Sequence, residues 1–198
     1  PPRPLMVAGS TWPEDEDMLL PALTEMLQNH RLRLILAPHE PTSKHLQNLE
    51  SKLKDKKIPF LRWSQFIAKE SNLKRSVILI DQVGILADLY TLSTLAFVGG
   101  SFRRKVHSVM EPLAAGCHVL VGPRIQNSAE AQTFQSPEFE NRYRTSLNLS
   151  PVQVVTSSSE LTHHLNAVLD ETKMLEEFHP KLQSLVRDQT GAAKLLVE

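Results

Sequence analysis

The chain has 198 residues, of which 41% are hydrophobic and 22% are charged, and its 22 basic and 22 acidic side chains give a formal net charge of zero. This composition is ordinary for a globular protein, and the length suffices for one domain with a sizeable core. No overall charge attracts nucleic acid or an anionic membrane, so we expect no nucleic-acid partner.

Four further features of the sequence narrow the class of protein to which the chain can belong. The single cysteine, Cys117, excludes an internal disulfide, and its small apolar neighbours favour a buried side chain over a nucleophile. No apolar run approaches the ~20 residues that span a bilayer. Because the sequence opens with PPRP and no methionine, we interpret residues 1–4 as a linker and the chain as part of a longer protein. The basic segment 44–75 is interpreted as a solvated face, with a surface for phosphate or lipid headgroups as the alternative.

Short apolar runs alternate with segments of helical spacing along the first half of the chain. We expect strands at 5–8, 31–37, 58–63 and 77–80, and helices over 18–27, 42–54 and 84–92. The polar residues 64–74 are expected to form an irregular connection. Residues 9–11 are expected to form a turn after the first strand.

The second half continues the alternation. We expect strands at 95–98, 119–121 and 152–155, and helices over 111–115, 129–135 and 160–169, with one or two more helices in 170–198. Gly116 is expected to end the helix before it. This order predicts a single α/β domain over residues 1–198, a three-layer, Rossmann-like fold with a mostly parallel sheet of about six strands.

Several unusual residues follow the predicted strands. Gly9 and Ser10 follow the first strand, His39 the second, and Gly99, Gly100 and Ser101 a later one. In a parallel sheet these residues share the carboxyl edge, where ligands of α/β folds bind. Glycines there let backbone N–H groups approach a phosphate, and an acidic residue at a helix start can accept hydrogen bonds from ribose hydroxyls.

Each of these signals is weak alone. A Gly-Gly pair is often plain turn geometry, His107 fits a surface histidine, and Glu111 before Pro112 fits an ordinary helix entry. The sequence contains no Walker loop, no GxGxxG and no CxxC or HExxH pattern. His163 and His164 have no partners at ligand spacing, so we expect no metal and no bound cofactor.

The combination is more specific than its parts. The segments FVGGS (97–101), HSVMEP (107–112), AAG (114–116) and VLVGP (119–123), followed by Asn127, resemble FVGGS…GGHNPLEPAAxGxPVLFGPxxxNF of the bacterial Kdo transferases. Upstream, VAGST (7–11), LILAP (34–38) and DQVGILADLYTLSTLA (81–96) resemble further elements of that family. The resemblance covers roughly residues 5–135.

The Kdo transferases are GT-B glycosyltransferases that move 3-deoxy-manno-octulosonic acid (Kdo) from CMP-Kdo to a lipid A precursor. The resemblance implies that this chain is the C-terminal half, which binds CMP-Kdo without metal or cofactor. It places Glu111 on the ribose hydroxyls and Gly9, Ser10, Gly99, Gly100 and Ser101 around phosphate, with His39, His107, Ser108 and Asn127 completing the site. The catalytic base and the lipid A precursor site would belong to an N-terminal domain, at the cytoplasmic face of the bacterial inner membrane.

The chain departs from the family pattern in two places. KVHS (105–108) stands where the family has GGHN, and His39 stands where the family has an arginine. A histidine holds a carboxylate or phosphate only weakly and only when protonated. Arg103, Arg104 and Arg124 are the candidates to take the place of the missing arginine. A transferase that uses a UDP- or GDP-sugar, and a non-catalytic binding module of the same fold, therefore remain alternatives.

Overall fold

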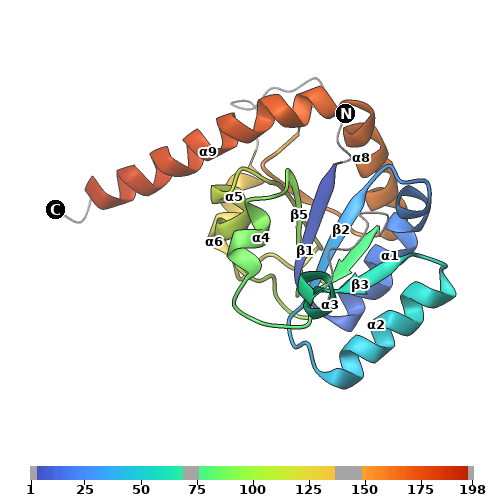
Figure 1. The fold of residues 1–198 in the computed structure, drawn as a ribbon. Helices are drawn as coiled ribbons and strands as arrows, with labels where there is room; N and C mark the ends of the chain where they lie inside the picture. The colour runs from blue at the N-terminus through green and yellow to red at the C-terminus, as the bar shows by residue number, and fades with distance from the viewer. Residues whose placement is uncertain (1–3, 69–75, 137–148, 196–198) are drawn as a thin grey trace.

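The computed structural model describes residues 4–68, 76–136 and 149–195. These residues form one sheet of seven strands in the order β3-β4-β2-β1-β5-β6-β7, and every pairing is parallel (Figure 1). The strands are β1 (Leu5–Thr11), β2 (Arg33–Pro38), β3 (Phe60–Arg62), β4 (Val77–Leu79), β5 (Leu95–Val98), β6 (His118–Val121) and β7 (Val152–Val154). The predicted α/β fold is confirmed: the sheet, expected to have about six strands, has seven, and each overlaps a segment in which a strand was expected.

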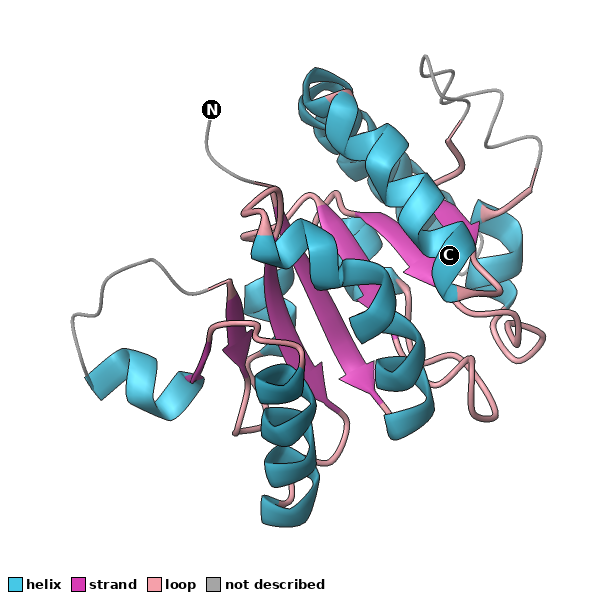
Figure 2. Ribbon diagram, turned by 90° about the vertical axis from the view of Figure 1, so that its right-hand side faces the viewer, coloured by secondary structure: helices cyan, strands magenta, loops and turns pink. Residues whose placement is uncertain are grey.

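Helices cover both faces of the sheet. They are α1 (Pro13–Gln28), α2 (Ser43–Asp55), α3 (Trp63–Ala68), α4 (Leu86–Tyr90), α5 (Met110–Ala114), α6 (Ala129–Phe134), α8 (Ser158–Asp170) and α9 (Thr172–Leu195). Figure 1 shows α1, α2 and α8 on one side of the sheet and α4, α5 and α6 on the other. Figure 2 shows the strands as a middle layer between helices.

The burial of β5 and β6 on both faces explains why the sequence predicts these strands well. Every residue of β5 and of β6 is buried, and the two strands are continuous runs, LAFV and HVLV. A parallel strand with helices on both faces buries both of its sides, so its residues do not alternate between apolar and polar. The one polar member, His118, is buried with them.

Two sequence expectations are wrong in detail. Residues 9–11 do not form a turn after the first strand, because β1 continues to Thr11 through a bulge between Gly9 and Thr11. Residues 64–68 are not irregular, because they belong to α3. The rest of the predicted irregular segment, 69–74, lies outside the described residues. Gly116 ends α5 as expected, with φ of 87°.

The strand order places a topological switch point beside β1. The chain runs from β1 outward through β2 on one side, and it later returns through β5 on the other. Helices that follow these strands lie on opposite faces, and in such folds ligands bind outside the carboxyl ends of the strands at this point. The sequence motifs Gly9–Ser10, at the end of β1, and Gly99–Gly100–Ser101, after β5, meet at this edge.

Helix α9 packs on α5 and then extends away from the rest of the molecule (Figure 1). Phe178 and Leu182 are buried at the packed end. His179 Nδ1 lies 3.1 Å from the Gly116 carbonyl oxygen, and Gln183 donates to the Ala115 carbonyl over 3.3 Å. Both contacts hold the C-terminal end of α5. Within the described residues, no helix is both long and apolar enough to cross a membrane.

Candidate functional site

The two glycine motifs pack directly against each other at the switch point. The Gly99 N–H donates to the Gly9 carbonyl over 2.9 Å. A Cβ on Gly99 would lie 2.2 Å from the Ser10 carbonyl oxygen, so only glycine fits there. Ser10 itself has φ of 53°, which turns the end of β1 around Gly99. The structure thus brings together Gly9, Ser10 and Gly99, as the sequence predicts.

The loop after β5 is closed by its own backbone. Gly100 has φ of 96°, and its carbonyl oxygen accepts hydrogen bonds from the N–H groups of residues 103, 104 and 105. The Ser101 hydroxyl is buried and accepts the N–H of Gly122 over 2.6 Å. Ser101 therefore joins the ends of β5 and β6 and is held within the protein.

A carboxylate of α1 accepts hydrogen bonds from backbone N–H groups of this loop. The buried Asp15 side chain accepts the N–H of Gly100 at 2.7 Å and of Phe102 at 3.3 Å. It also accepts the N–H of Trp12 at 2.9 Å, at the N-terminus of α1. Burial raises the pKa of Asp15, and the three backbone N–H groups oppose this shift because they stabilise the ionised form. The protein's own carboxylate thus occupies the amide of Gly100, which the sequence suggests for phosphate, and the nearby amide of Phe102.

An aromatic cluster lies beside the loop. The rings of His39 and His107 stack with centroids 4.4 Å apart, and His39 also contacts Trp12 at 4.8 Å. The Trp12 indole Nε1–H donates to His107 Nε2 over 3.0 Å. The Arg103 guanidinium lies 3.9 Å from the centre of the Trp12 ring, within cation–π distance. His39 and His107, which are 68 positions apart in sequence, are therefore direct neighbours.

The other predicted residues lie around this centre. Asn127 holds Val106 by both backbone groups, accepting its N–H over 3.1 Å and donating to its carbonyl over 2.9 Å. Ser108 and Glu111 are exposed, in and just after the short segment that enters α5. Among the described contacts, no hydrogen bond joins the Glu111 carboxylate to the glycine loops. The charge of Glu111 does contribute to the raised pKa of Tyr90, whose burial is the main cause.

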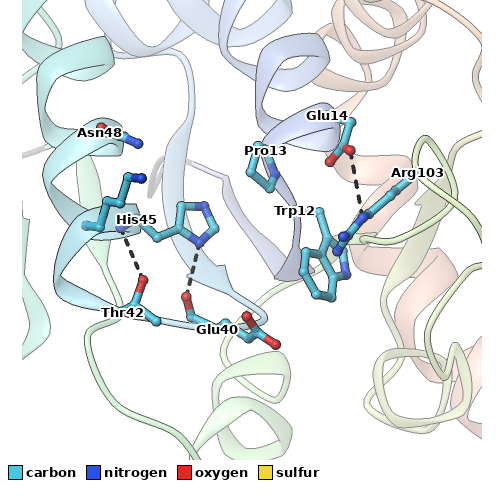
Figure 3. Close-up of a pocket in the computed structure, with 9 residues that line it drawn as sticks. Trp12, Pro13, Glu14, Glu40, Thr42, His45, Asn48 and Arg103 are labelled. Atoms are coloured by element: carbon cyan, nitrogen blue, oxygen red, sulfur yellow. Dashed lines mark hydrogen bonds and ion pairs between the residues drawn. The ribbon is translucent and has the colours of Figure 1, made fainter.

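A cavity of about 280 Å³ opens between the N-termini of α1 and α2. Figure 3 shows Arg103 over Trp12 on one side and the first turn of α2 on the other. Its lining includes Trp12, Glu14, Glu40, Lys44 and Arg103, a mixture of acids and cations. None of the predicted site residues lines this cavity, although Trp12 connects it to His39 and His107.

Asp15 and Trp12 were not predicted as members of the site, and Arg103 was considered only as a substitute for the family's arginine. Asp15 reads as an ordinary acid of a helix first turn. Their roles come from contacts that span 85 positions or more between α1 and the loop after β5. The one available signal was that all three lie in segments that follow strands. No cluster of metal-ligating side chains occurs in the described residues.

No protein-family model matches this sequence. Among curated proteins, the chain is 35% identical over 130 residues to a 3-deoxy-D-manno-octulosonic acid transferase of Chlamydophila psittaci, covering 64% of this chain and 28% of that protein. It is 28% identical over 199 residues to the enzyme of the same name from Haemophilus influenzae, covering 99% of this chain and 43% of that protein. The chain therefore spans less than half the length of these relatives.

Solved structures agree on the fold. The C-terminal CMP-Kdo binding domain of WaaA from Acinetobacter baumannii superimposes with a TM-score of 0.74 at 22% identity, covering 93% of this chain and 90% of that domain. The C-terminal domain of the glycosyl transferase LpcC from Francisella tularensis gives a TM-score of 0.62 at 12% identity, covering 95% and 86%. The chain is thus similar in sequence to curated Kdo transferases, and its fold is that of the C-terminal half of a GT-B glycosyltransferase.

Proposed function

We propose that this chain is the nucleotide-sugar-binding part of a Kdo transferase and that it binds CMP-Kdo. The observation that carries the proposal is the contact between Gly99 and Ser10, which joins the two glycine motifs at the switch point of the sheet, where nucleotides bind in such folds. The similarity to Kdo transferases over most of the chain supports the choice of nucleotide sugar.

In this proposal Glu111 accepts hydrogen bonds from the two ribose hydroxyls. Its carboxylate is exposed at the start of α5, and no described side chain pairs with it. The phosphate lies beside Ser10 and Ser108. The space beside Gly99 and Gly100 is filled by the protein's own backbone, so these glycines shape the loop, and Asp15 keeps the Gly100 and Phe102 amides for the loop itself. Asn127 shapes the site by fixing Val106.

The chemical step needs groups that we assign to the rest of a longer protein. A base there deprotonates the acceptor hydroxyl of a lipid A precursor, and the sugar is transferred with inversion. This chain holds the nucleotide and stabilises the charge of the leaving CMP phosphate. The complete protein acts in lipopolysaccharide synthesis at the cytoplasmic face of the inner membrane.

Calorimetric titration of the chain with CMP, UDP and GDP tests the proposal. We expect selective binding of CMP, weakened about tenfold or more by Glu111→Ala, which corresponds to about 1.4 kcal/mol. Glu25→Ala is the matched control, because Glu25 is exposed on the far half of α1.

Two other results would contradict the proposal. A preference for UDP or GDP would assign a different sugar nucleotide, and a solved neighbour with this fold does hold UDP and glucose, with a TM-score of 0.58 at 13% identity. No binding of any nucleotide at millimolar concentration would favour a non-catalytic module that keeps the fold.

A further inference from the structure

The contact between Trp12 and His107 fixes the chemistry of a site histidine. Trp12 occupies the position before α1, where its backbone N–H is held by Asp15. Its indole Nε1–H reaches across 95 positions to His107 Nε2, at 3.0 Å. Both residues are half-buried, so the bond is partly shielded from water.

An indole N–H is a hydrogen-bond donor only. His107 Nε2 must therefore be the acceptor, which requires that Nε2 carries no proton. A neutral imidazole has one proton, so the proton of His107 sits on Nδ1. The imidazolium carries protons on both nitrogens, and it could not form this bond.

The surroundings of His107 also oppose its protonation. The ring of His39 stacks on it, and Lys105 and Arg103 lie on the same loop. Burial, followed by His39 and Lys105, lowers the pKa of His107 below its ordinary value. The acids on the facing helix are engaged elsewhere, because Asp15 binds backbone N–H groups and Glu14 lies 3.8 Å from Arg103.

The ring is also oriented. Its Cδ2–Nε2 edge faces Gly100, where a Cβ would lie 3.0 Å from Cδ2 and 3.3 Å from Nε2. The Nδ1 corner is on the opposite side of the ring. Within the part of the chain that the structure describes, no hydrogen bond is formed by Nδ1, so this donor is available to a ligand.

We propose that Trp12 is a positioning residue that keeps His107 as the neutral Nδ1–H tautomer, so that His107 donates a hydrogen bond to an anionic oxygen of the bound nucleotide sugar. His107 is then a hydrogen-bond donor and does not act as a general acid. The part that concerns the ligand rests on the proposed function, whereas the tautomer is a property of the free protein.

The tautomer can be read directly from a long-range ¹H–¹⁵N correlation spectrum of the imidazole nitrogens. In the wild-type chain at pH 7 we expect His107 with its proton on Nδ1, and a Trp12 indole N–H that exchanges slowly with water. This measurement requires no variant. A proton on Nε2, or an imidazolium, would overturn the inference.

Trp12→Phe removes the indole donor and keeps an aromatic ring beside His39 and Arg103. We expect both tautomers of His107 to be populated in this variant, and the pKa of His107 to rise, because the neutral form loses its partner. Trp63→Phe is the control, because Trp63 is the chain's other tryptophan and stacks on Phe66 in α3. An unchanged tautomer in Trp12→Phe would show that Trp12 does not position the ring.

The ligand contact is tested by adding CMP, cytidine or free Kdo to the same sample. A shift of the His107 Nδ1–H signal with CMP but not with cytidine assigns the phosphate, and a shift with Kdo assigns the sugar carboxylate. Trp12→Phe should weaken binding of the assigned ligand about three- to tenfold, the range of one hydrogen bond. If CMP binds and neither anion shifts His107, the ligand contact is wrong. If CMP does not bind at all, the proposed function fails while the tautomer result stands.

Discussion

The carboxylate of Asp15 accepts a hydrogen bond of 2.7 Å from the backbone N–H of Gly100, which lies 85 positions later in the chain. A buried carboxylate is stable only when its oxygens are paired, and here the backbone of a glycine loop supplies the partners. Helix α1 and the loop after β5 are therefore joined by an internal anion at the edge where a ligand would enter.

Asp15→Asn tests how much this anion stabilises the loop. The amide retains one acceptor oxygen, but its NH₂ group must face backbone N–H donors. We expect a loss of about 1–3 kcal/mol in the free energy of unfolding, measured by urea denaturation. Asp17→Asn on the same helix, where the side chain is 67% exposed and pairs with Lys52, should change it by less than about 0.5 kcal/mol. Equal losses in the two variants would refute the role of Asp15.

Gly99→Ala tests the packing of the two glycine motifs. The new Cβ would meet the backbone of Ser10 at 2.2 Å, which no side-chain rotation can relieve. We expect a loss of about 3 kcal/mol. Gly84→Ala provides the comparison: no atom lies within 4 Å of its Cβ, so only the strain of its φ of 90° remains, about 1 kcal/mol. Thermal unfolding of both variants measures the difference, and a smaller loss in Gly99→Ala would contradict the close approach.

Asn127 should control the loop that carries His107. Asn127→Asp keeps the acceptor for the Val106 N–H but places a second oxygen against the Val106 carbonyl, where the amide now donates. We expect the unfolding free energy to fall by about 1–2 kcal/mol and CMP to bind more weakly, because the loop loses its fixed position. Chemical denaturation and calorimetry check the two effects. Stability that falls with unchanged CMP affinity would separate Asn127 from the site.

His118 and His164 should make the protein sensitive to acid. Their Nε2 atoms are 2.8 Å apart, so one ring must donate and the other, which accepts, must carry no proton on Nε2. Burial is the main cause that lowers the pKa of His118 to about 3 and of His164 to about 4. In the unfolded chain each titrates at about 6.5. The unfolded state therefore binds more protons below pH 6.5, and stability falls as the pH decreases from there toward 4.

The slope of this loss is at most about 1.4 kcal/mol per pH unit for each histidine. Asp15 and Glu16 act in the opposite sense, because burial raises the pKa of both carboxyl groups and the folded state takes up their protons first. A comparison of wild type with His164→Gln cancels the contribution of these acids. We expect a shallower slope in the variant between pH 6.5 and 4, whereas the exposed His163→Gln should follow the wild type.

The sheet was predictable because each strand carries its own local signal. β4 and β5 are unbroken apolar runs, β6 is apolar after His118, and the spacing of Leu46, Leu49 and Leu53 identifies the buried face of α2. The end of β1 was not predictable. Gly9 and Ser10 have the composition of a turn, and only pairing with β2 and β5 keeps them in the strand.

The site was predictable to the extent that parallel strands share one edge. His39 and His107 were assigned to it separately, and they stack. The partners that orient them were not accessible, because Trp12 and Asp15 lie in a segment whose local pattern is fully explained as a helix start. Their function depends on a crossing between α1 and the β5 loop, which no local pattern encodes.

Helix α5 has a proposed ligand-binding residue at its start and contacts with α9 at its end. Glu111 stands in its first turn, and the carbonyls of Ala115 and Gly116 at its end are held by Gln183 and His179 of α9. Because the helix spans only Met110–Ala114, these contacts lie within two turns of Glu111. We therefore expect a displacement of the packed end of α9 to change the position of the Glu111 carboxylate, which would couple the C-terminal helix to the ribose end of the proposed site.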